Sequence, residues 1–98
     1  MERRIFRRKP IAIDGEARSS TGTFAAVISD ISEDGLCFAA ERTCNVGEHL
    51  SLTWRLQPHE HPMDVECRVR YSTPERTGVE FLNLATHDRL RIMYLLTV

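Results

Sequence analysis

The stretch Leu50-Ser51-Leu52-Thr53-Trp54-Arg55-Leu56-Gln57 alternates strictly between apolar and polar residues. Residues 65–71, Val-Glu-Cys-Arg-Val-Arg-Tyr, repeat the same alternation. Side chains two positions apart share one face of a strand, so each stretch predicts a strand that is buried on one side. Residues 58–62, Pro-His-Glu-His-Pro, lie between them, and prolines interrupt a ladder. We therefore predict an antiparallel hairpin with a five-residue loop, in which Trp54 and Tyr71 face inward.

Further short strands are predicted on both sides of this hairpin. Residues 11–14 alternate, residues 24–31 are apolar on both faces, and residues 36–40 and 78–82 form two more short runs. Glu33-Asp34-Gly35 is a turn signal, and we expect a positive φ at Gly35. About six strands this closely spaced are typical of a small β-barrel. The fold class is therefore predicted to be mainly all-β, a six-stranded antiparallel barrel.

The C-terminal residues change their period. Thr86 can cap a helix, Asp88 is favourable in its first turn, and the apolar run that follows is wide. We predict a helix over residues 86–97 that packs on the barrel, with Arg89 and Arg91 facing solvent. The predicted organisation is one domain over residues 1–98, with a flexible basic arm at 1–10, the barrel at 11–83 and this helix.

Composition excludes several classes of protein. A chain of 98 residues with 42% hydrophobic and 28% charged residues is one ordinary globular domain rather than a disordered chain. The three cysteines include no Cys-x-x-Cys pair, so a disulfide framework is not expected, and Cys37 and Cys67 are predicted to be core residues. No apolar run is long enough for a membrane span or a signal peptide. We expect a cytoplasmic protein.

Two short motifs carry groups that can hold an anionic ligand. Residues 2–9 contain five of the 13 Lys and Arg residues, although the net charge is only −1. Arginine presents a planar fork that suits phosphate oxygens or the O6 and N7 edge of guanine. Later in the chain, Asp30 offers two acceptors for guanine N–H donors, Ser32 offers a hydroxyl, and Gly35 allows a tight turn. Taken separately, each motif also has a plain reading, as a solvated basic tail or as ordinary turn chemistry.

Taken together, the two motifs resemble the signature of the PilZ domain family. Arg4-x-x-x-Arg8 precedes Asp30-x-Ser32-x-x-Gly35, and Val69-Arg70-Tyr71 with Gly78-Val79-Glu80-Phe81 looks like the closing strands of the family. The resemblance covers essentially the whole chain and implies a stand-alone barrel that binds the bacterial second messenger cyclic di-GMP on its outer surface. It assigns ligand contacts to these residues: Arg3, Arg4, Arg7, Arg8, Asp30, Ser32 and Gly35.

The resemblance also bears on stoichiometry and output. An arginine at the position of Arg3 accompanies binding of an intercalated ligand dimer in the family. Arg3-x-x-x-Arg7 satisfies the same spacing as Arg4-x-x-x-Arg8, so the register of the motif stays open. Since ordering a mobile arm costs entropy, we expect a Kd near micromolar, about −8 kcal/mol. Without a fused effector domain, the chain is expected to act through an unidentified effector protein or to serve as a ligand buffer. The C-terminal helix also offers a surface for a homodimer.

Other kinds of function receive less support. The histidines of the 58–62 loop lack the spacing of zinc ligands, so no metal or other cofactor is expected. No nucleophile elbow or phosphate loop accompanies Ser32 or His87, so an enzyme is not expected. Two non-enzymatic alternatives remain, namely a nucleotide-independent interaction adaptor and a small barrel that binds single-stranded nucleic acid. The second of these needs exposed aromatic residues, whereas Trp54 and Tyr71 are both predicted to be internal.

Overall fold

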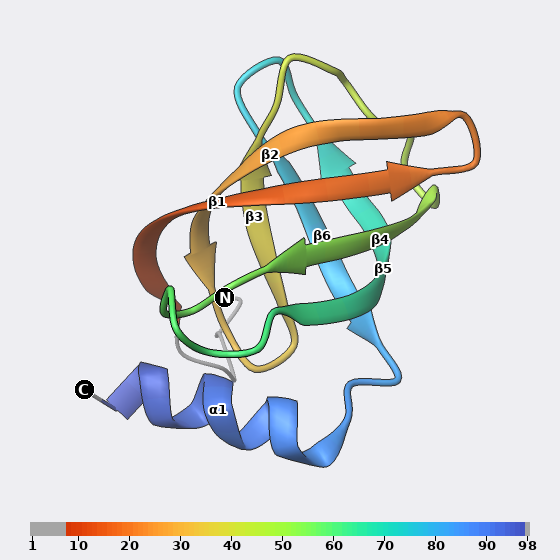
Figure 1. The fold of residues 1–98 in the computed structure, drawn as a ribbon. Coiled ribbons are helices and arrows are strands. Elements are labelled where there is room, and N and C mark those ends of the chain that lie inside the picture. The colour runs from red at the N-terminus through yellow and green to blue at the C-terminus, as the bar shows by residue number, and fades with distance from the viewer. Residues whose placement is uncertain (1–7, 98) are drawn as a thin grey trace, which may run out of the picture.

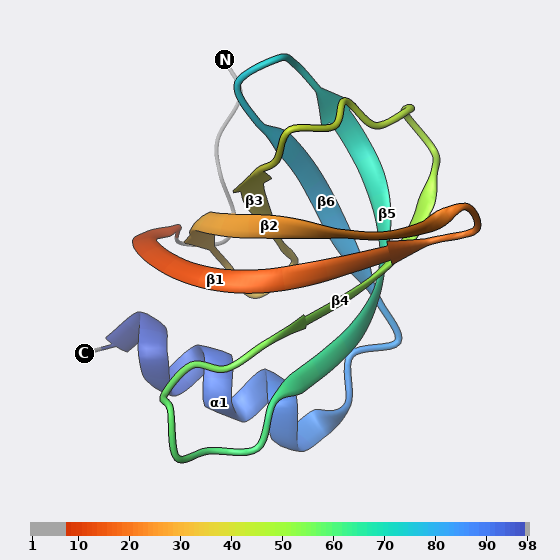
Figure 2. The same cartoon turned by 45° about the horizontal axis from the view of Figure 1, so that its top comes forward.

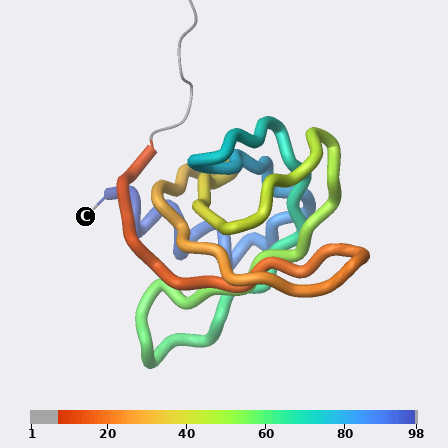
Figure 3. Tube along the Cα trace, turned by 90° about the horizontal axis from the view of Figure 1, so that it is seen from above, coloured from red at the N-terminus to blue at the C-terminus, as the bar shows by residue number. Residues whose placement is uncertain are grey.

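The computed structural model describes residues 8–97, which form a closed antiparallel barrel followed by a helix. The elements are β1 (Lys9–Ser19), β2 (Gly22–Ile31), β3 (Gly35–Ala39), β4 (His49–Trp54), β5 (Met63–Ser72), β6 (Thr77–Leu82) and α1 (Thr86–Thr97). Around the barrel the strand order is β1-β2-β3-β6-β5-β4, with β1 pairing to β4 to close the ring. Seen from above, the chain trace runs around in a ring (Figure 3). The predicted six-stranded barrel with a C-terminal helix is confirmed (Figure 1).

The core lies inside the barrel and follows the alternation read from the sequence. In β5 the inward side chains are at most 3% exposed, and they are Met63, Val65, Cys67 and Val69. Trp54 at the end of β4 is 2% exposed, so its predicted internal position is correct. Leaving these side chains exposed would cost about 1.5–3 kcal/mol each, which is the main drive toward the closed sheet. All three cysteines are free thiols, as expected.

Helix α1 lies across one open end of the barrel (Figure 2). Ile92 is fully buried and Leu96 is 9% exposed, and both belong to the core cluster. Arg91 does not face open solvent as predicted: its guanidinium contacts Glu60 at 2.9 Å and Asp88 at 3.3 Å. It also donates to the carbonyl of His61 at 2.9 Å. Arg91 therefore fastens the helix to the loop between β4 and β5, a long-range contact that the local sequence does not encode.

The central hairpin differs from the prediction in its loop. Strand β4 ends at Trp54 and β5 begins at Met63, so residues 55–62 form the connection instead of residues 58–62. The guanidinium of Arg55 donates to the carbonyl of Glu60 at 2.6 Å and folds the loop back on itself. These contacts replace the ladder that alternation alone would have continued to Gln57. Strand β1 is longer than predicted, and the β1–β2 hairpin extends beyond the barrel wall (Figure 2).

Gly35 is required for a reason other than the predicted one. It does not have a positive φ; among the described residues, the glycines with positive φ are Gly22 and Gly47. A Cβ at Gly35 would lie 2.0 Å from the carbonyl oxygen of Val79 on β6. No side chain fits in that space, so Gly35 allows β3 and β6 to approach closely. Within residues 8–97, α1 is too short and too polar to cross a lipid bilayer.

Candidate ligand-binding face

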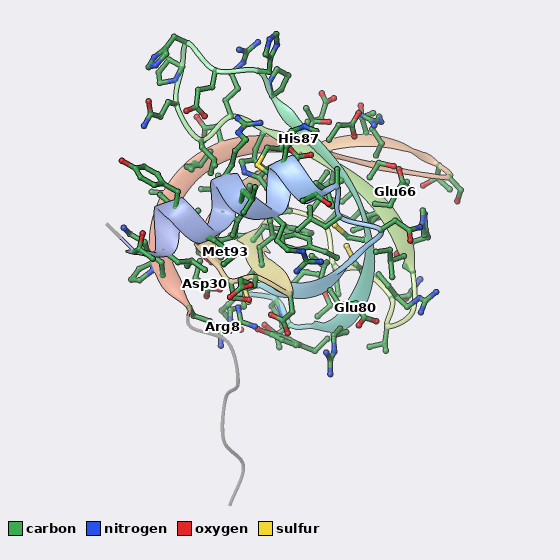
Figure 4. All side chains as sticks on the ribbon, turned by 90° about the horizontal axis from the view of Figure 1, so that it is seen from below. Arg8, Asp30, Glu66, Glu80, His87 and Met93 are labelled. Atoms are coloured by element: carbon green, nitrogen blue, oxygen red, sulfur yellow. The ribbon has the colours of Figure 1, made fainter. Side chains whose placement is uncertain are left out.

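The two motifs of the sequence meet at the start of β1. Atom Nη1 of Arg8 lies 2.5 Å from Oδ1 of Asp30, although the residues are 22 positions apart. The β1–β2 register places Pro10 opposite Asp30, which brings the residue before β1 to the end of β2. Their side chains are 28% and 18% exposed, so the pair lies at the surface but is sheltered. Figure 4 shows Arg8 and Asp30 together, whereas Glu66 and His87 lie well away from them.

The charges of this pair are well defined. Partial burial disfavours the charged guanidinium, but the hydrogen bond and negative charge of Asp30 outweigh this effect and raise the pKa of Arg8. Arg8 therefore stays protonated. The Arg8 guanidinium bonds to Oδ1 of Asp30, and no donor within residues 8–97 bonds to Oδ2. A carboxylate offers about four lone-pair positions, so Asp30 can accept from a ligand while it holds Arg8.

The turn between β2 and β3 uses Ser32 internally. Ser32 is 1% exposed, and its hydroxyl contacts the carboxylate of Asp34 and the carbonyl of Gly35, the latter at 3.2 Å. The amide of Ser32 donates to the Gly35 carbonyl at 2.8 Å, and Phe81 donates to the Asp34 carbonyl at 2.8 Å. The turn is thus closed on itself and attached to β6. Of the predicted ligand residues, Asp30 lies on the surface, whereas Ser32 and Gly35 lie beneath it.

A row of paired residues runs from Asp30 across four strands. Asp30 on β2 pairs with Cys37 on β3, Cys37 pairs with Gly78 on β6, and Gly78 pairs with Tyr71 on β5. We call these four residues the cross-strand row. The hydroxyl of Tyr71 lies 2.9 Å from Sγ of Cys37, and Nη1 of Arg8 lies 3.8 Å from the same sulfur. The row therefore connects the Arg8–Asp30 pair to an aromatic ring on the outer surface.

The predicted internal position of Tyr71 is wrong. The pairing of β5 with β6 shifts by one residue between Val69 and Tyr71, and this irregularity reverses the inward and outward alternation. Tyr71 is consequently 36% exposed. Its ring lies on Gly78, where an added Cβ would come within 2.2 Å of Cε1. Desolvation and the hydrogen bond to Cys37 raise the pKa of Tyr71, so the phenol is neutral at physiological pH.

Cys37 is a buried core residue, as predicted, and is 1% exposed. It does not belong to the cluster of core side chains that contains Cys67. Its sulfur instead contacts the hydroxyl of Tyr71 and the guanidinium of Arg8. The sequence shows Cys37 in phase with apolar neighbours. However, the pairing of β2 with β3 is irregular between Ile28 and Asp30, and this changes which residues share a row.

Sequence reasoning missed two residues of this face, Tyr71 and Arg76. The guanidinium carbon of Arg76, in the β5–β6 turn, lies 5.9 Å from the centre of the Tyr71 ring. The sequence indicates the position of the Tyr71 ring only through Gly78, because a residue without a side chain leaves room for a ring to lie on it. The predicted ligand residues Arg3, Arg4 and Arg7 lie outside the described residues. In the described part of the chain, no three His, Cys, Asp or Glu side chains converge as metal ligands do.

Comparison with known proteins identifies the family and the fold. The family model described as "PilZ domain" matches residues 2–97. The chain belongs to the PilZ domain family. PilZ domains are non-catalytic receptors, and the family includes receptors of cyclic di-GMP. Comparison with curated protein sequences gives no significant match.

Several solved structures share this PilZ fold at low sequence identity. The Bacillus subtilis inhibitor of motility MotI/DgrA has a TM-score of 0.82 and 20% identity, over 99% of this chain and 51% of that one. The PilZ domain of YcgR from Escherichia coli, solved with c-di-GMP, has a TM-score of 0.80 and 12% identity over 98% and 90%. The MrkH–c-di-GMP complex of K. pneumonia has a TM-score of 0.80 and 16% identity over 99% and 52%. The chain therefore spans about half the length of MotI/DgrA and of MrkH.

Proposed function

We propose that this PilZ domain binds cyclic di-GMP through its arginine-rich N-terminal segment and Asp30, and that it relays the level of the messenger to a partner protein. The observation that carries the proposal is the 2.5 Å contact between Arg8 and Asp30. This contact brings a residue of the arginine-rich motif together with the first residue of the Asp-x-Ser-x-x-Gly motif. The ion pair also places a positive and a negative group side by side at a partly buried position on the surface.

The chemistry of the ligand matches these groups. Each guanine carries N–H donors on one edge and the acceptors O6 and N7 on another, and the ligand has two negative charges. Oδ2 of Asp30 has no donor among residues 8–97 and can accept from the guanine N–H groups, and the Arg8 guanidinium can donate to phosphate or to O6 and N7. Removing such an edge contact typically costs about 1–3 kcal/mol, which is enough to distinguish guanine from adenine.

The remaining motif residues are assigned different tasks. Ser32 and Gly35 hold the turn that presents Asp30, because both are buried and the Ser32 hydroxyl is occupied within the turn. Arg4 is assigned a second ligand contact on motif spacing, with Arg7 in the alternative register. Arg3 is assigned the binding of a ligand dimer, also on motif spacing.

The proposed receptor passes on its signal through a shift between conformations and not through a chemical reaction. Ligand binding shifts the population of conformations of the protein, and a partner protein in the cytoplasm recognises the altered surface. No catalytic task is assigned to any residue of the face, since its groups are suited to holding a ligand. Barrels that bind single-stranded nucleic acid also use exposed aromatic rings such as that of Tyr71. The test therefore has to distinguish binding of cyclic di-GMP from binding of nucleic acid.

Calorimetric titration of wild-type protein and three variants tests the proposal. Arg8→Ala and Asp30→Ala are expected to lose binding by at least tenfold, because each removes a charged contact. Arg18→Gln is the matched control, since its ion pair with Asp64 is exposed on the β1–β4–β5 side of the barrel. Binding that survives both site variants would refute the assignment. Steep, base-independent loss of binding with added salt would instead indicate nucleic-acid binding.

A further inference from the structure

Tyr71 and Arg76 form a second feature at the far end of the cross-strand row. One face of the Tyr71 ring lies on the backbone of Gly78, and the Arg76 guanidinium lies over the ring, 5.9 Å from its centre. We propose that one guanine of cyclic di-GMP inserts between the Tyr71 ring and the Arg76 guanidinium, while the other guanine is recognised by Asp30. This inference rests on the proposed function and adds two residues that no motif assigns.

The ring is held as a fixed platform. A Cβ at position 78 would come within 2.2 Å of Cε1 and 2.6 Å of Cζ, so only glycine lets the ring lie against β6. The hydroxyl contact to Cys37, 2.9 Å, fixes the orientation of the ring along the row. A platform that is fixed before the ligand arrives loses little further entropy on binding.

Arg76 combines a fixed backbone with a mobile side chain. The amide of Thr73 donates to the carbonyl of Arg76 at 2.8 Å, and the amide of Arg76 donates to Oγ1 of Thr73 at 3.1 Å. The turn is therefore tight. The side chain of Arg76 is exposed, and within residues 8–97 its only described interaction is with the Tyr71 ring. It can move without breaking an ion pair.

The spacing suits a base after a small movement. Planar groups in contact lie about 3.5–4.0 Å apart, so a base between two of them needs a gap of about 7–8 Å. The present 5.9 Å separation is too small by roughly 1–2 Å. A rotamer change of the long Arg76 side chain supplies this movement. Aromatic rings and arginine guanidinium planes are the two kinds of surface on which proteins stack unpaired bases.

The two ends of the row would recognise bases in different ways. Asp30 reads hydrogen-bond donors on the edge of a base, whereas stacking on Tyr71 accepts any base because every base has a π face. Arg8 and Tyr71 both contact Cys37, so the two ends are close enough to serve one small ligand. The inference therefore assigns base specificity to the Asp30 end and additional affinity to the Tyr71–Arg76 end.

Calorimetry with cyclic di-GMP, cyclic GMP–AMP and cyclic di-AMP tests this division. Arg76→Gln and Tyr71→Leu are each expected to weaken cyclic di-GMP binding by about 5- to 150-fold, the range for loss of one stacked base. Tyr71→Phe keeps the ring and is expected to retain most of the affinity. The mixed nucleotide has one guanine for Asp30 and an adenine for the ring, so it should bind much better than cyclic di-AMP.

The outcomes separate this inference from the proposed function. If wild-type protein binds none of the three nucleotides, the proposed function itself fails. If Arg8→Ala abolishes binding while Arg76→Gln and Tyr71→Leu behave like the Arg18→Gln control, only the stacking inference is overturned. Because Arg76 is exposed, its variant is expected to fold even where Tyr71→Leu is destabilised. Upfield shifts of the Tyr71 ring protons on ligand addition would report stacking directly, and unchanged shifts in the complex would contradict it.

Discussion

Arg8, just before β1, and Asp30, near the end of β2, form an ion pair with a separation of 2.5 Å. The pair spans 22 positions of sequence, so it depends on the β1–β2 register and links the N-terminal segment to the barrel. A sheltered pair of this kind is expected to contribute about 1 kcal/mol. A double-mutant cycle of Arg8→Ala and Asp30→Ala, followed by urea unfolding, is expected to give a coupling energy of that size. A coupling energy of zero would contradict a stabilising contribution of the pair.

Gly35 and Gly78 are expected to respond differently to the same added methyl group. In Gly35→Ala the new Cβ would meet a backbone carbonyl at 2.0 Å, so the strands must separate and stability should fall by more than about 2 kcal/mol. In Gly78→Ala it would meet the side chain of Tyr71, which can rotate away. Gly78→Ala should therefore fold, with a smaller loss of stability and weaker binding of cyclic di-GMP.

The control for the Gly78 substitution is the double variant with Tyr71→Ala. Removing the ring relieves the clash, so the two changes should be strongly non-additive in unfolding experiments. Additive losses would indicate that the ring does not lie on Gly78.

Ser32 is expected to affect stability and not ligand contact. Its hydroxyl is buried and bonded to Asp34 and to the Gly35 carbonyl, so Ser32→Ala should cost about 1–2 kcal/mol in chemical unfolding. The Kd for cyclic di-GMP should change by less than about threefold, as long as the turn stays folded. Ser20→Ala, in the exposed turn between β1 and β2, is the matched control and should change stability by less than about 0.5 kcal/mol. A large change in Kd at unchanged stability would instead place the Ser32 hydroxyl on the ligand.

Burial of Cys67 makes the protein sensitive to alkaline pH. Burial raises the pKa of the Cys67 thiol from 9.0 to about 12. Below pH 9 the thiol is neutral in both states, but between pH 9 and 12 it ionises only in the unfolded chain, so stability falls as pH rises. The loss is expected to approach about 1.4 kcal/mol per pH unit. Urea unfolding of wild type and Cys67→Val from pH 8 to 11 measures this, and parallel curves for the two proteins would rule the effect out.

The sequence predicted the barrel well because its signals are local and repeated. Alternation around Leu52 and Val65 identifies strands with one buried face, and the change of period after Thr86 identifies the helix. The strands and the helix follow from side-chain periodicity, which a single sequence contains. Arg8 and Asp30 were singled out by the resemblance to the PilZ family, and the structure places the two side chains in contact.

The outward position of Tyr71 could not be predicted in the same way. It depends on one extra residue in the pairing of β5 with β6, and nothing in Val69-Arg70-Tyr71 marks such a shift. The local sequence predicts that Arg91 faces solvent, because its partner Glu60 lies 31 positions away and local patterns do not indicate such a contact. The sequence predicts a positive φ as the reason for glycine at position 35, whereas the actual reason is the close approach of β6, which leaves no room for a Cβ. Each of these errors concerns a long-range contact that local patterns do not specify.

The most direct test of the account is calorimetric titration of the folded wild-type protein with cyclic di-GMP, with GMP and cyclic GMP as controls. The account predicts a Kd near micromolar, about −8 kcal/mol, for cyclic di-GMP and no comparable binding of the two mononucleotides. A stoichiometry of two ligands per chain would support the assignment of Arg3 to a ligand dimer, and one per chain would contradict that assignment. If the folded protein does not bind cyclic di-GMP, the central claim is wrong, and the PilZ domain acts as a nucleotide-independent adaptor.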